Sequence, residues 1–460
     1  MKTIVVGGGA TGLALGYLLS RAGQSVQLVE ASDRAGGLMN TFDVGDGSRL
    51  EYFYHHFFTH DAEINWLIDE LGLGDSIRFV ESTMSILRNG QFFDFNGLKD
   101  LLRFKAMGLL GRFRFGLTSA LLAYMKRYAK REDRTALDWF YSYAGRDATD
   151  SIWKPMLEVK FGDAADKIPL AWIASRLRQR VRSRKSGVEK LGYLKGSLQV
   201  LTDRLIATLE NQGVAIGLRK QVAGFKRIPK KGIELSFSDG TAAIGDRVIF
   251  TIPTCHLSPL FRSHSLDYAR RLSEIKYLGA ICTVLSFSKQ LSSTYWTNIA
   301  DGECDFGGVI EQTNLVPNSW YGGQNIVYLS KYAMHSDSIW KDSDDQLIER
   351  QLRQLGRVYG RDLKEDLNKA WVFRSKTAAP VTDMGFRDRV PGFQTPVPDV
   401  YMASMCHLYP EERSVNNSIR VAAELLHSMG EHEVADQVPR GISIAGEIGH
   451  EQTAAMKRAA

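Results

Sequence analysis

The first 37 residues carry the feature that most restricts how this chain can fold. A short apolar run, Ile4 to Val6, leads into a G-x-G-x-x-G motif at Gly7, Gly9 and Gly12, and the apolar stretch Leu13 to Leu19 follows. This order predicts a buried strand, a tight glycine turn and a helix. The turn permits a close backbone approach to a pyrophosphate, which the helix N-terminus would face.

A second strand and an acidic residue complete the pattern. Gly23 ends the predicted helix, Ser25 to Val29 form the next strand, and Glu30 closes it 18 residues after Gly12. An acid at this place accepts hydrogen bonds from ribose hydroxyls. The whole unit therefore predicts an α/β, Rossmann-like domain that binds a dinucleotide.

The residues after Glu30 distinguish a flavin from a nicotinamide cofactor. Arg34, Gly36 and Gly37 complete an E-x-x-x-R-x-G-G pattern. This pattern resembles the FAD-dependent amine oxidase superfamily, which includes protoporphyrinogen oxidases and phytoene desaturase-like carotenoid desaturases. The resemblance recurs at 192–197, 246–253 and 401–419. It implies an FAD-binding domain of the two-dinucleotide-binding-domain type, discontinuous in sequence, with an inserted α+β substrate domain.

The length of 460 residues suits two sizeable cores. We expect an FAD-binding domain at 1–60, 190–262 and 380–430, a substrate domain at 61–189 and 263–379, and a C-terminal tail at 431–460, to which we assign no role. Apolar patterning predicts helices at 61–71 and 344–355 and a hairpin of 233–237 with 246–251. Strands at 280–287, 306–310 and 325–331 predict an antiparallel sheet that would floor the substrate pocket.

The motif and the resemblance together select the residues that we expect to contact FAD. In relatives, the residue equivalent to Val222 offers its backbone to the adenine. The segment that Thr251 to Pro253 resembles ends a strand beside the cofactor, and a helix N-terminus at the place of Ser414 faces the flavin pyrimidine ring. No Cys or His lies in a flavin-attachment motif, so we expect noncovalent binding. The full set is Gly7, Gly9, Ala10, Thr11, Gly12, Glu30, Ala31, Arg34, Gly36, Gly37, Leu38, Val222, Thr251, Pro253, Arg413, Ser414 and Asn416.

Two stretches depart from the family pattern. Relatives usually have two adjacent glycines where this chain has Gly196 and Ser197. The familiar A-G-D is replaced by Ala403, Ser404 and Met405, so the acidic contact to ribityl or phosphate is missing there.

The dense aromatic run Leu50 to Phe58 contains two adjacent histidines, His55 and His56. If this run is extended, neighbouring side chains point to opposite faces. We therefore expect one histidine to face the flavin or substrate, as a catalytic proton carrier that titrates near neutral pH, and the other to pack. A core strand with satisfied histidines is the alternative. Further along, Lys160, Trp172 and Arg176 could either approach substrate or clamp helices.

Composition limits the partners. The net charge of +6 is modest and unevenly spread, which argues against a nucleic-acid partner. The four cysteines show neither metal spacing nor C-x-x-C pairing, so we expect no metal and a reducing, cytoplasmic location. The run Ile4 to Val6 is too short for the core of a cleaved leader. A small-molecule substrate is expected, and the sequence leaves the oligomeric state open.

Residues 98–134 read as helical and strongly basic, with leucines interleaved among lysines and arginines. A basic amphipathic helix can lie in a membrane interface, where its cations face anionic lipid headgroups. The same pattern also fits a solvated basic face over a domain core. Peripheral membrane contact through 98–134 is therefore one of two alternatives.

The function expected from these features is FAD-dependent oxidoreduction, with a hydride taken from a C–N or C–C bond of an organic substrate. Two rivals remain open. One is a flavin-dependent nucleotide-sugar mutase of the UDP-galactopyranose type, in which Arg176, Arg180 and Arg374 would have to converge on a diphosphate. The other is a non-catalytic, membrane-associated flavoprotein. The sequence does not identify the substrate, the electron acceptor or a catalytic base.

Overall fold

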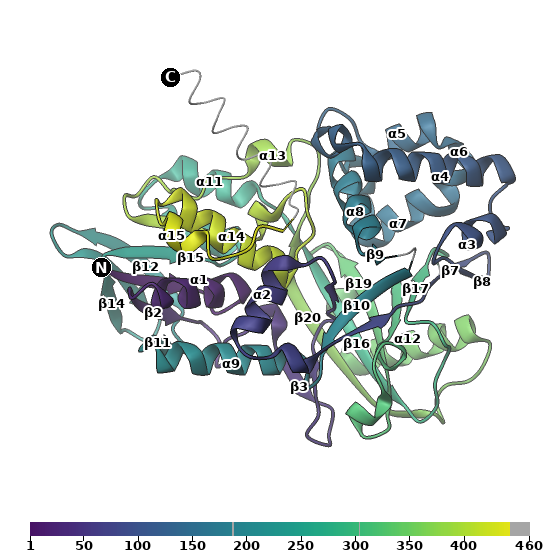
Figure 1. Cartoon of the computed structure of the whole chain (residues 1–460), viewed down its shortest axis with the longest axis horizontal. Coiled ribbons are helices and arrows are strands. Elements are labelled where there is room, and N and C mark those ends of the chain that lie inside the picture. The colour runs from purple at the N-terminus through teal and green to yellow at the C-terminus, as the bar shows by residue number, and fades with distance from the viewer. Residues whose placement is uncertain (186–187, 303, 442–460) are drawn as a thin grey trace.

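The structure, a computed structural model, describes residues 1–185, 188–302 and 304–441. Two parts lie side by side in Figure 1. One contains the purple N-terminal unit and the yellow helix α14 (Val415–Ser428), and the other contains a large sheet with a group of blue helices above it.

A parallel five-stranded sheet forms the centre of the first part. Its order is β11-β2-β1-β15-β21, and every neighbouring pair is parallel. The strands come from four separate stretches of sequence, so this Rossmann-like unit is discontinuous, as predicted. Their bounds are β1 (Lys2–Val6), β2 (Ser25–Val29), β11 (Ala215–Gly217), β15 (Arg247–Phe250) and β21 (Val400–Met402).

Successive side chains of β1 point to opposite faces of the sheet, and each face has its own hydrophobic core. Val5 packs into one core with helices, while Ile4 and Val6 pack into the other. The helices of the first core are α1 (Ala10–Arg21), α2 (Ala62–Glu70), α9 (Ser197–Asn211), α14 and α15 (His432–Ala435). The second core is covered by β12 (Val222–Ile228), β13 (Gly232–Phe237), β14 (Ala242–Gly245), α10 (Thr254–Phe261) and α11 (Leu266–Glu274).

The predicted hairpin of 233–237 with 246–251 is wrong in its second strand. β13 pairs with β14 instead, across the turn at Asp239 and Gly240. Every residue of β15 is buried, as expected of a central parallel strand with both faces covered. That is why β15 lies beside β1 and not beside β13.

The second part contains a seven-stranded sheet in the order β20-β16-β19-β18-β17-β7-β8, antiparallel except where β17 meets β7. The three predicted strands and the helix at 344–355 are confirmed as β16, β18, β19 and α12. The bounds are β7 (Met84–Arg88), β8 (Gln91–Asp94), β16 (Tyr277–Phe287), β17 (Trp296–Ile299), β18 (Gly308–Glu311), β19 (Asn325–Ala333), β20 (Leu367–Pro380) and α12 (Asp344–Tyr359).

Smaller strands connect the two parts. A short sheet has the order β5-β10-β6, with β9 paired to β10, and β3 pairs with β4. α2 confirms the helix predicted at 61–71 and packs against α14. The predicted division into domains stays a prediction. The bounds are β3 (Thr41–Asp43), β4 (Arg49–Glu51), β5 (Phe57–Phe58), β6 (Ile77–Glu81), β9 (Arg184–Lys185), β10 (Val188–Leu194) and the short helix α13 (Phe386–Arg389).

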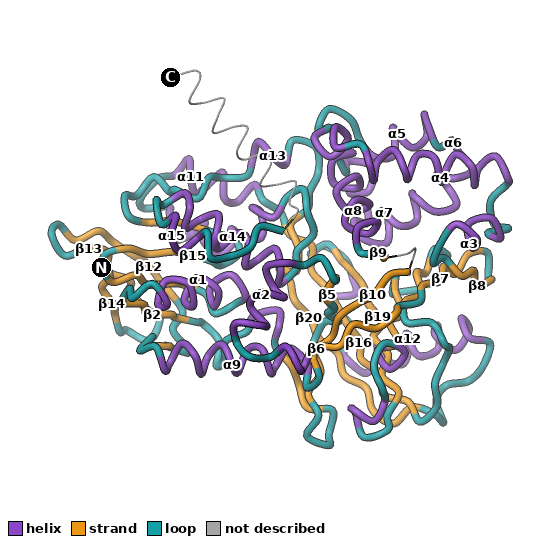
Figure 2. Tube along the Cα trace, in the orientation of Figure 1, coloured by secondary structure: helices purple, strands orange, loops and turns teal. Residues whose placement is uncertain are grey.

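A helical lobe stands over one end of the large sheet, at the upper right of Figure 2. Its core includes Trp153, whose ring stacks on Phe140 at a centroid distance of 4.2 Å. The predicted helical region of 98–134 is broken by a non-helical stretch at 104–108, and its last α-helix ends at Tyr124, so the prediction is wrong for 131–134. The helices are α3 (Leu98–Arg103), α4 (Leu109–Tyr124), α5 (Ala136–Tyr143), α6 (Gly145–Ala148), α7 (Lys154–Phe161) and α8 (Leu170–Arg182).

Candidate active site

One cavity of about 1220 Å³ runs between the two parts. The glycine turn after β1 and the N-terminus of α14 border it on one side. On the other side its walls come from α7, α8 and β19. The glycine turn and the side chains of α7, α8 and β19 therefore line the same cavity.

The glycine turn has the shape that a bound dinucleotide requires. A Cβ at Gly12 would lie 1.9 Å from the carbonyl oxygen of Gly7, so only glycine lets α1 pack this close to the turn. Gly7 has a φ of +110°, which disfavours any side chain. A Cβ at Gly9 would meet nothing within 4 Å, and Gly9 borders the cavity. The open space beside Gly9 fits the close approach of a pyrophosphate to the N-terminus of α1.

Glu30 is held in place beside this turn. Its Oε2 accepts a hydrogen bond of 2.6 Å from the Gly8 amide, and its Oε1 accepts from the amide and hydroxyl of Ser32 at 2.9 and 2.8 Å. Because Glu30 also borders the cavity, its carboxylate is oriented for the ribose contact that the sequence predicts.

Most of the residues predicted to contact FAD border this cavity. The exceptions are Gly12, whose role is in packing, and Arg34. Arg34 lies 3.8 Å from Asp33, donates a hydrogen bond of 3.4 Å to the Thr41 carbonyl and does not reach the cavity. The members that do border it are Gly7, Gly9, Ala10, Thr11, Glu30, Ala31, Gly36, Gly37, Leu38, Val222, Thr251, Pro253, Arg413, Ser414 and Asn416.

The N-terminus of α14 is capped and fixed to its neighbours. The Ser414 side chain accepts a hydrogen bond of 3.0 Å from the Asn417 amide, as an N-cap does. The Asn416 side chain accepts 3.0 Å from the Ile64 amide, which ties α14 to α2. The remaining amides of this first turn can face an anion, as the resemblance predicts for the flavin pyrimidine ring.

His55 and His56 both border the cavity, contrary to the expectation that one would pack away from it. Residues 53–56 lie outside any strand, so strand alternation does not apply to them. His55 Nδ1 donates to the Phe53 carbonyl at 2.6 Å. Burial and the nearby Arg413 lower the pKa of His55 to about 4. Burial and Arg180 lower the pKa of His56 to about 3.

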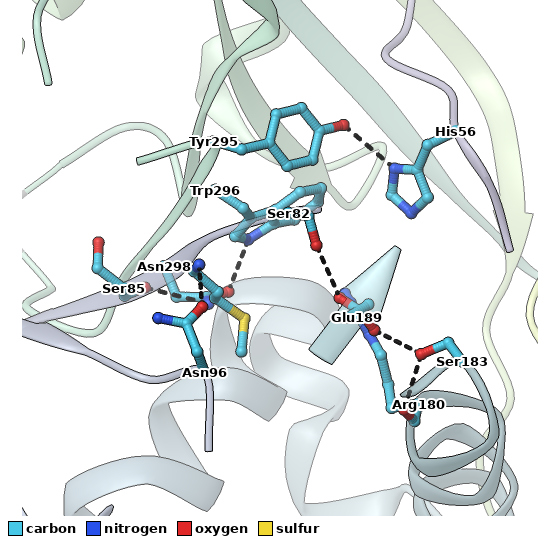
Figure 3. A network of polar contacts seen from close by, with 11 residues as sticks. His56, Ser82, Ser85, Asn96, Arg180, Ser183, Glu189, Tyr295, Trp296 and Asn298 are labelled. Carbon is cyan, nitrogen blue, oxygen red and sulfur yellow. Dashed lines mark hydrogen bonds and ion pairs between the residues drawn. The ribbon is translucent and has the colours of Figure 1, made fainter. Parts of the chain in front are cut away.

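Both imidazoles are therefore neutral at pH 7, and the expectation of titration near neutrality is wrong. The surroundings of His56 are shown in Figure 3, where the Tyr295 hydroxyl points toward the ring and Glu189 and Arg180 lie below it in the view. His56 Nδ1 lies 3.2 Å from the Tyr295 hydroxyl, and Arg180 lies 2.8 Å from Glu189. Direct contact of either histidine with substrate stays a prediction.

A cationic wall formed by Lys160, Arg176 and Arg413 borders the cavity, next to Glu412. Lys160 makes a close ion pair with Glu412 and lies 4.8 Å from the ring centroid of Trp172. Arg176 lies 3.1 Å from the same carboxylate. Burial alone would raise the pKa of Glu412, but Lys160 and Arg176 lower it to about 2. Lys160 and Arg176 thus pair with one carboxylate, and the nearby charge of Arg413 lowers its pKa further.

The pKa of Tyr332 shows the effect of the positive charges at this wall. Its hydroxyl accepts a hydrogen bond of 3.2 Å from Arg413. Burial alone would raise the pKa of Tyr332, but Arg413 and Lys160 bring it below its ordinary value. From the sequence, Lys160 and Arg176 could either approach substrate or clamp helices, and their position at the cavity favours the first alternative. The sequence carries no signal for Glu412, which lies 252 residues from Lys160.

Asp61 is a second acid that the sequence did not single out. It borders the cavity, and its Oδ2 accepts a hydrogen bond of 2.8 Å from the Phe58 amide. Burial raises the pKa of Asp61 to about 7, against the opposing effect of that hydrogen bond. Asp61 thus changes charge close to neutral pH, unlike the two histidines.

These features have a counterpart among known proteins. A model of the family described as flavin containing amine oxidoreductase matches residues 10–426. The chain belongs to this family. Its cofactor is FAD, and its general chemistry is oxidoreduction.

Members and structural neighbours differ widely in what they act on. The 15-cis-phytoene desaturase of Solanum lycopersicum is 22% identical over 396 residues, which cover 81% of this chain and 67% of that protein. A solved structure from Exiguobacterium sp. 255-15, described as a candidate protoporphyrinogen oxidase, is 19% identical, with a TM-score of 0.73 over 93% of this chain and 98% of that one.

A reduced UDP-galactopyranose mutase is 15% identical to this chain, with a TM-score of 0.72 over 97% of both chains. Likeness to solved structures at such low identity shows the fold alone, so the substrate of this family member has to be argued from its own cavity.

Proposed function

We propose that this protein takes a hydride from a C–N or C–C bond of an organic substrate that carries an anionic group, and passes it to FAD. The observation that supports this proposal is the single cavity that joins the glycine turn of β1 to the cationic wall. Bound FAD supplies the hydride acceptor. The chain's own residues bind the cofactor and orient the substrate beside it.

The cationic wall is the part of the cavity that selects the substrate. Lys160 and Arg176 share the single carboxylate of Glu412, and Arg413 is hydrogen-bonded to the Tyr332 hydroxyl, so the wall keeps a surplus of positive charge. Because buried charge without a counter-charge is costly, this surplus favours a ligand that brings negative charge. Arg413 Nε is buried and makes no hydrogen bond within the described chain. A carboxylate or phosphate on the substrate would satisfy it, whereas a cationic polyamine would be repelled. An uncharged polyprenoid would leave it unpaired.

The mutase rival rests on the predicted convergence of three arginines. Arg176, Arg180 and Arg374 do border the same cavity, which favours this rival. However, each already has an acidic partner: Glu412 for Arg176, Glu189 for Arg180, and Asp344 for Arg374. A nucleotide diphosphate would have to compete with these carboxylates, and for that reason we place oxidation first.

Oxygen-free mixing of the FAD-loaded protein with a substrate panel tests the proposal. The panel holds amines, porphyrinogens, polyprenoids and nucleotide sugars. Loss of oxidised-flavin absorbance with a carboxylate-bearing or phosphate-bearing compound supports oxidation. Isomerisation of a nucleotide sugar only after prior reduction would instead establish the mutase, and no turnover of any kind would favour a non-catalytic flavoprotein.

A pair of variants on α7 tests the anionic group. Lys160→Met should raise the KM for an anionic substrate about 10-fold to 100-fold, the value of a hydrogen bond to a charged group. Lys154→Met is the matched control, because Lys154 does not border this cavity and pairs with Glu158 on the surface. Equal KM values for the two variants would contradict the role of the wall.

A further inference from the structure

The helix α4 carries an apolar stripe on its solvent side. At 3.6 residues per turn, six exposed side chains of α4 fall within an arc of about 100°. Their exposed fractions reach 76% at Leu109, the largest of the set. The members are Leu109, Leu110, Phe113, Leu117, Ala120 and Tyr124.

The opposite face of α4 is also apolar and is the one that packs. Phe115 and Leu122 are buried there in the core of the helical lobe. A surface helix normally turns charged and polar residues outward. The outward stripe is therefore not explained by the fold of the lobe, since a separate face already supplies the contacts that hold α4 in place.

The helix α3 extends this exposed surface. Leu98 is 71% exposed and Leu102 is 59% exposed. Leu101 of α3 lies 3.4 Å from the point where a Cβ on Gly116 would stand, which places α3 along one edge of the stripe. Apolar surface gathered over two neighbouring helices marks a site of interaction.

The cations around the stripe indicate the chemistry of its partner. Arg112 and Arg114 flank the stripe on its two sides, and Arg103 at the end of α3 and Lys105 after it are exposed. Residues 98–131 contain nine lysines and arginines and one acid, Asp100. Apolar side chains rimmed by cations match a surface that is anionic outside and hydrocarbon beneath, where long basic side chains reach the headgroups.

From this geometry we propose that α3 and α4 dock the protein onto the surface of a bilayer that contains anionic lipid. Among the described residues, no helix is both long and apolar enough to cross a membrane, so the contact is interfacial. Its position is shown in Figure 1, where both helices lie at the edge of the molecule opposite β2 and β14. α4 packs on α8, which lines the cavity, so one lobe carries both the docking surface and part of the substrate site.

Co-sedimentation of the FAD-loaded protein with vesicles tests this proposal. Vesicles of phosphatidylcholine mixed with phosphatidylglycerol should bind most of the protein at low salt, and vesicles of phosphatidylcholine alone should bind much less. Raised salt should weaken the binding, because exposed charges are screened. Wild-type protein that stays in the supernatant with both vesicle types would overturn the proposal.

Variants locate the contact. Replacing Leu110, Phe113 and Leu117 together by Ser should abolish vesicle binding, and because all three are exposed, the fold and FAD content should be unchanged. Leu266→Ser is the matched control, since Leu266 is 69% exposed on α11 of the FAD-binding unit. Unchanged binding by the triple variant would refute the stripe as the docking surface.

Two further experiments test the role of the cations and the possibility that a second copy of the chain covers the stripe. Arg103→Gln combined with Lys105→Gln should reduce binding to anionic vesicles, and unchanged binding would contradict the role of the cations. Sedimentation velocity without vesicles checks for a second copy as the occupant. A dimer that the triple Ser variant dissociates, with no vesicle binding by either protein, would overturn the membrane assignment.

Discussion

Substitution of Glu412 by Gln should destabilise the protein by about 3 kcal/mol at neutral pH. The pKa of Glu412 falls from 4.5 to about 2 in the folded state, and the side chain is 19% exposed. Each pKa unit corresponds to about 1.36 kcal/mol, which gives about 3 kcal/mol for the ionised carboxylate. The same loss, seen from Lys160 and Arg176, is the removal of one partner from a buried ion pair, which costs about 3–5 kcal/mol in other proteins and agrees with this figure.

The pH dependence has a definite sign. Because the folded pKa is depressed, the contribution of Glu412 is fully present above 4.5 and is lost as the pH falls toward about 2. Urea unfolding at pH 7 and at pH 3 measures it, and the difference between wild type and Glu412→Gln should shrink at the lower pH. Glu158→Gln, which breaks an exposed pair with Lys154, should cost less than about 1 kcal/mol. A Glu412 effect as small as that of Glu158, or one independent of pH, would show that the Glu412 carboxylate is not held ionised by Lys160 and Arg176.

Three further predictions concern the cofactor, the backbone and an acid. Glu30→Ala should weaken FAD binding by about 1.5–3 kcal/mol in a fluorescence titration, whereas Asp33→Ala, at an exposed side chain, should leave it unchanged. Ser197 has a φ of +69°, so Ser197→Gly should raise the unfolding free energy by about 1 kcal/mol, and a decrease would contradict this. The raised pKa of Asp61 should make stability fall as the pH rises from about 4 to about 7, and Asp61→Asn should flatten that slope in thermal melts.

Local patterns were sufficient for much of the fold. The order of strand, glycines, helix and acid at 2–30 is specified by neighbouring residues, and it is confirmed as β1, α1 and β2. The predicted pairing of 233–237 with 246–251 was wrong because two strands near in sequence, β14 and β15, were both possible partners of β13. The fully buried β15 lies in the central sheet instead, beside β1. The apolar and basic character of 98–134 was visible in the sequence, but the face of α4 that stays exposed was not, since both of its faces are apolar and only packing shows which one is buried.

The site divides in the same way. The glycine turn and Glu30 could be predicted because their geometry is local. The cationic wall depends on contacts between residues far apart in the chain, as in the pair Lys160 and Glu412, and no sequence spacing encodes them. The raised pKa of Asp61 and the lowered pKa values of the two histidines come mainly from burial, which cannot be seen in a single sequence.

Hydride transfer from a substrate in this cavity to FAD can be followed by oxygen-free stopped-flow mixing, with a substrate from the panel labelled with deuterium at the oxidised carbon. We predict that oxidised-flavin absorbance is lost in one turnover, and more slowly with the deuterated substrate than with the unlabelled one. Flavin that stays oxidised with every panel member, while prereduced protein isomerises a nucleotide sugar, would show that the protein is a mutase and not an oxidase of these substrates.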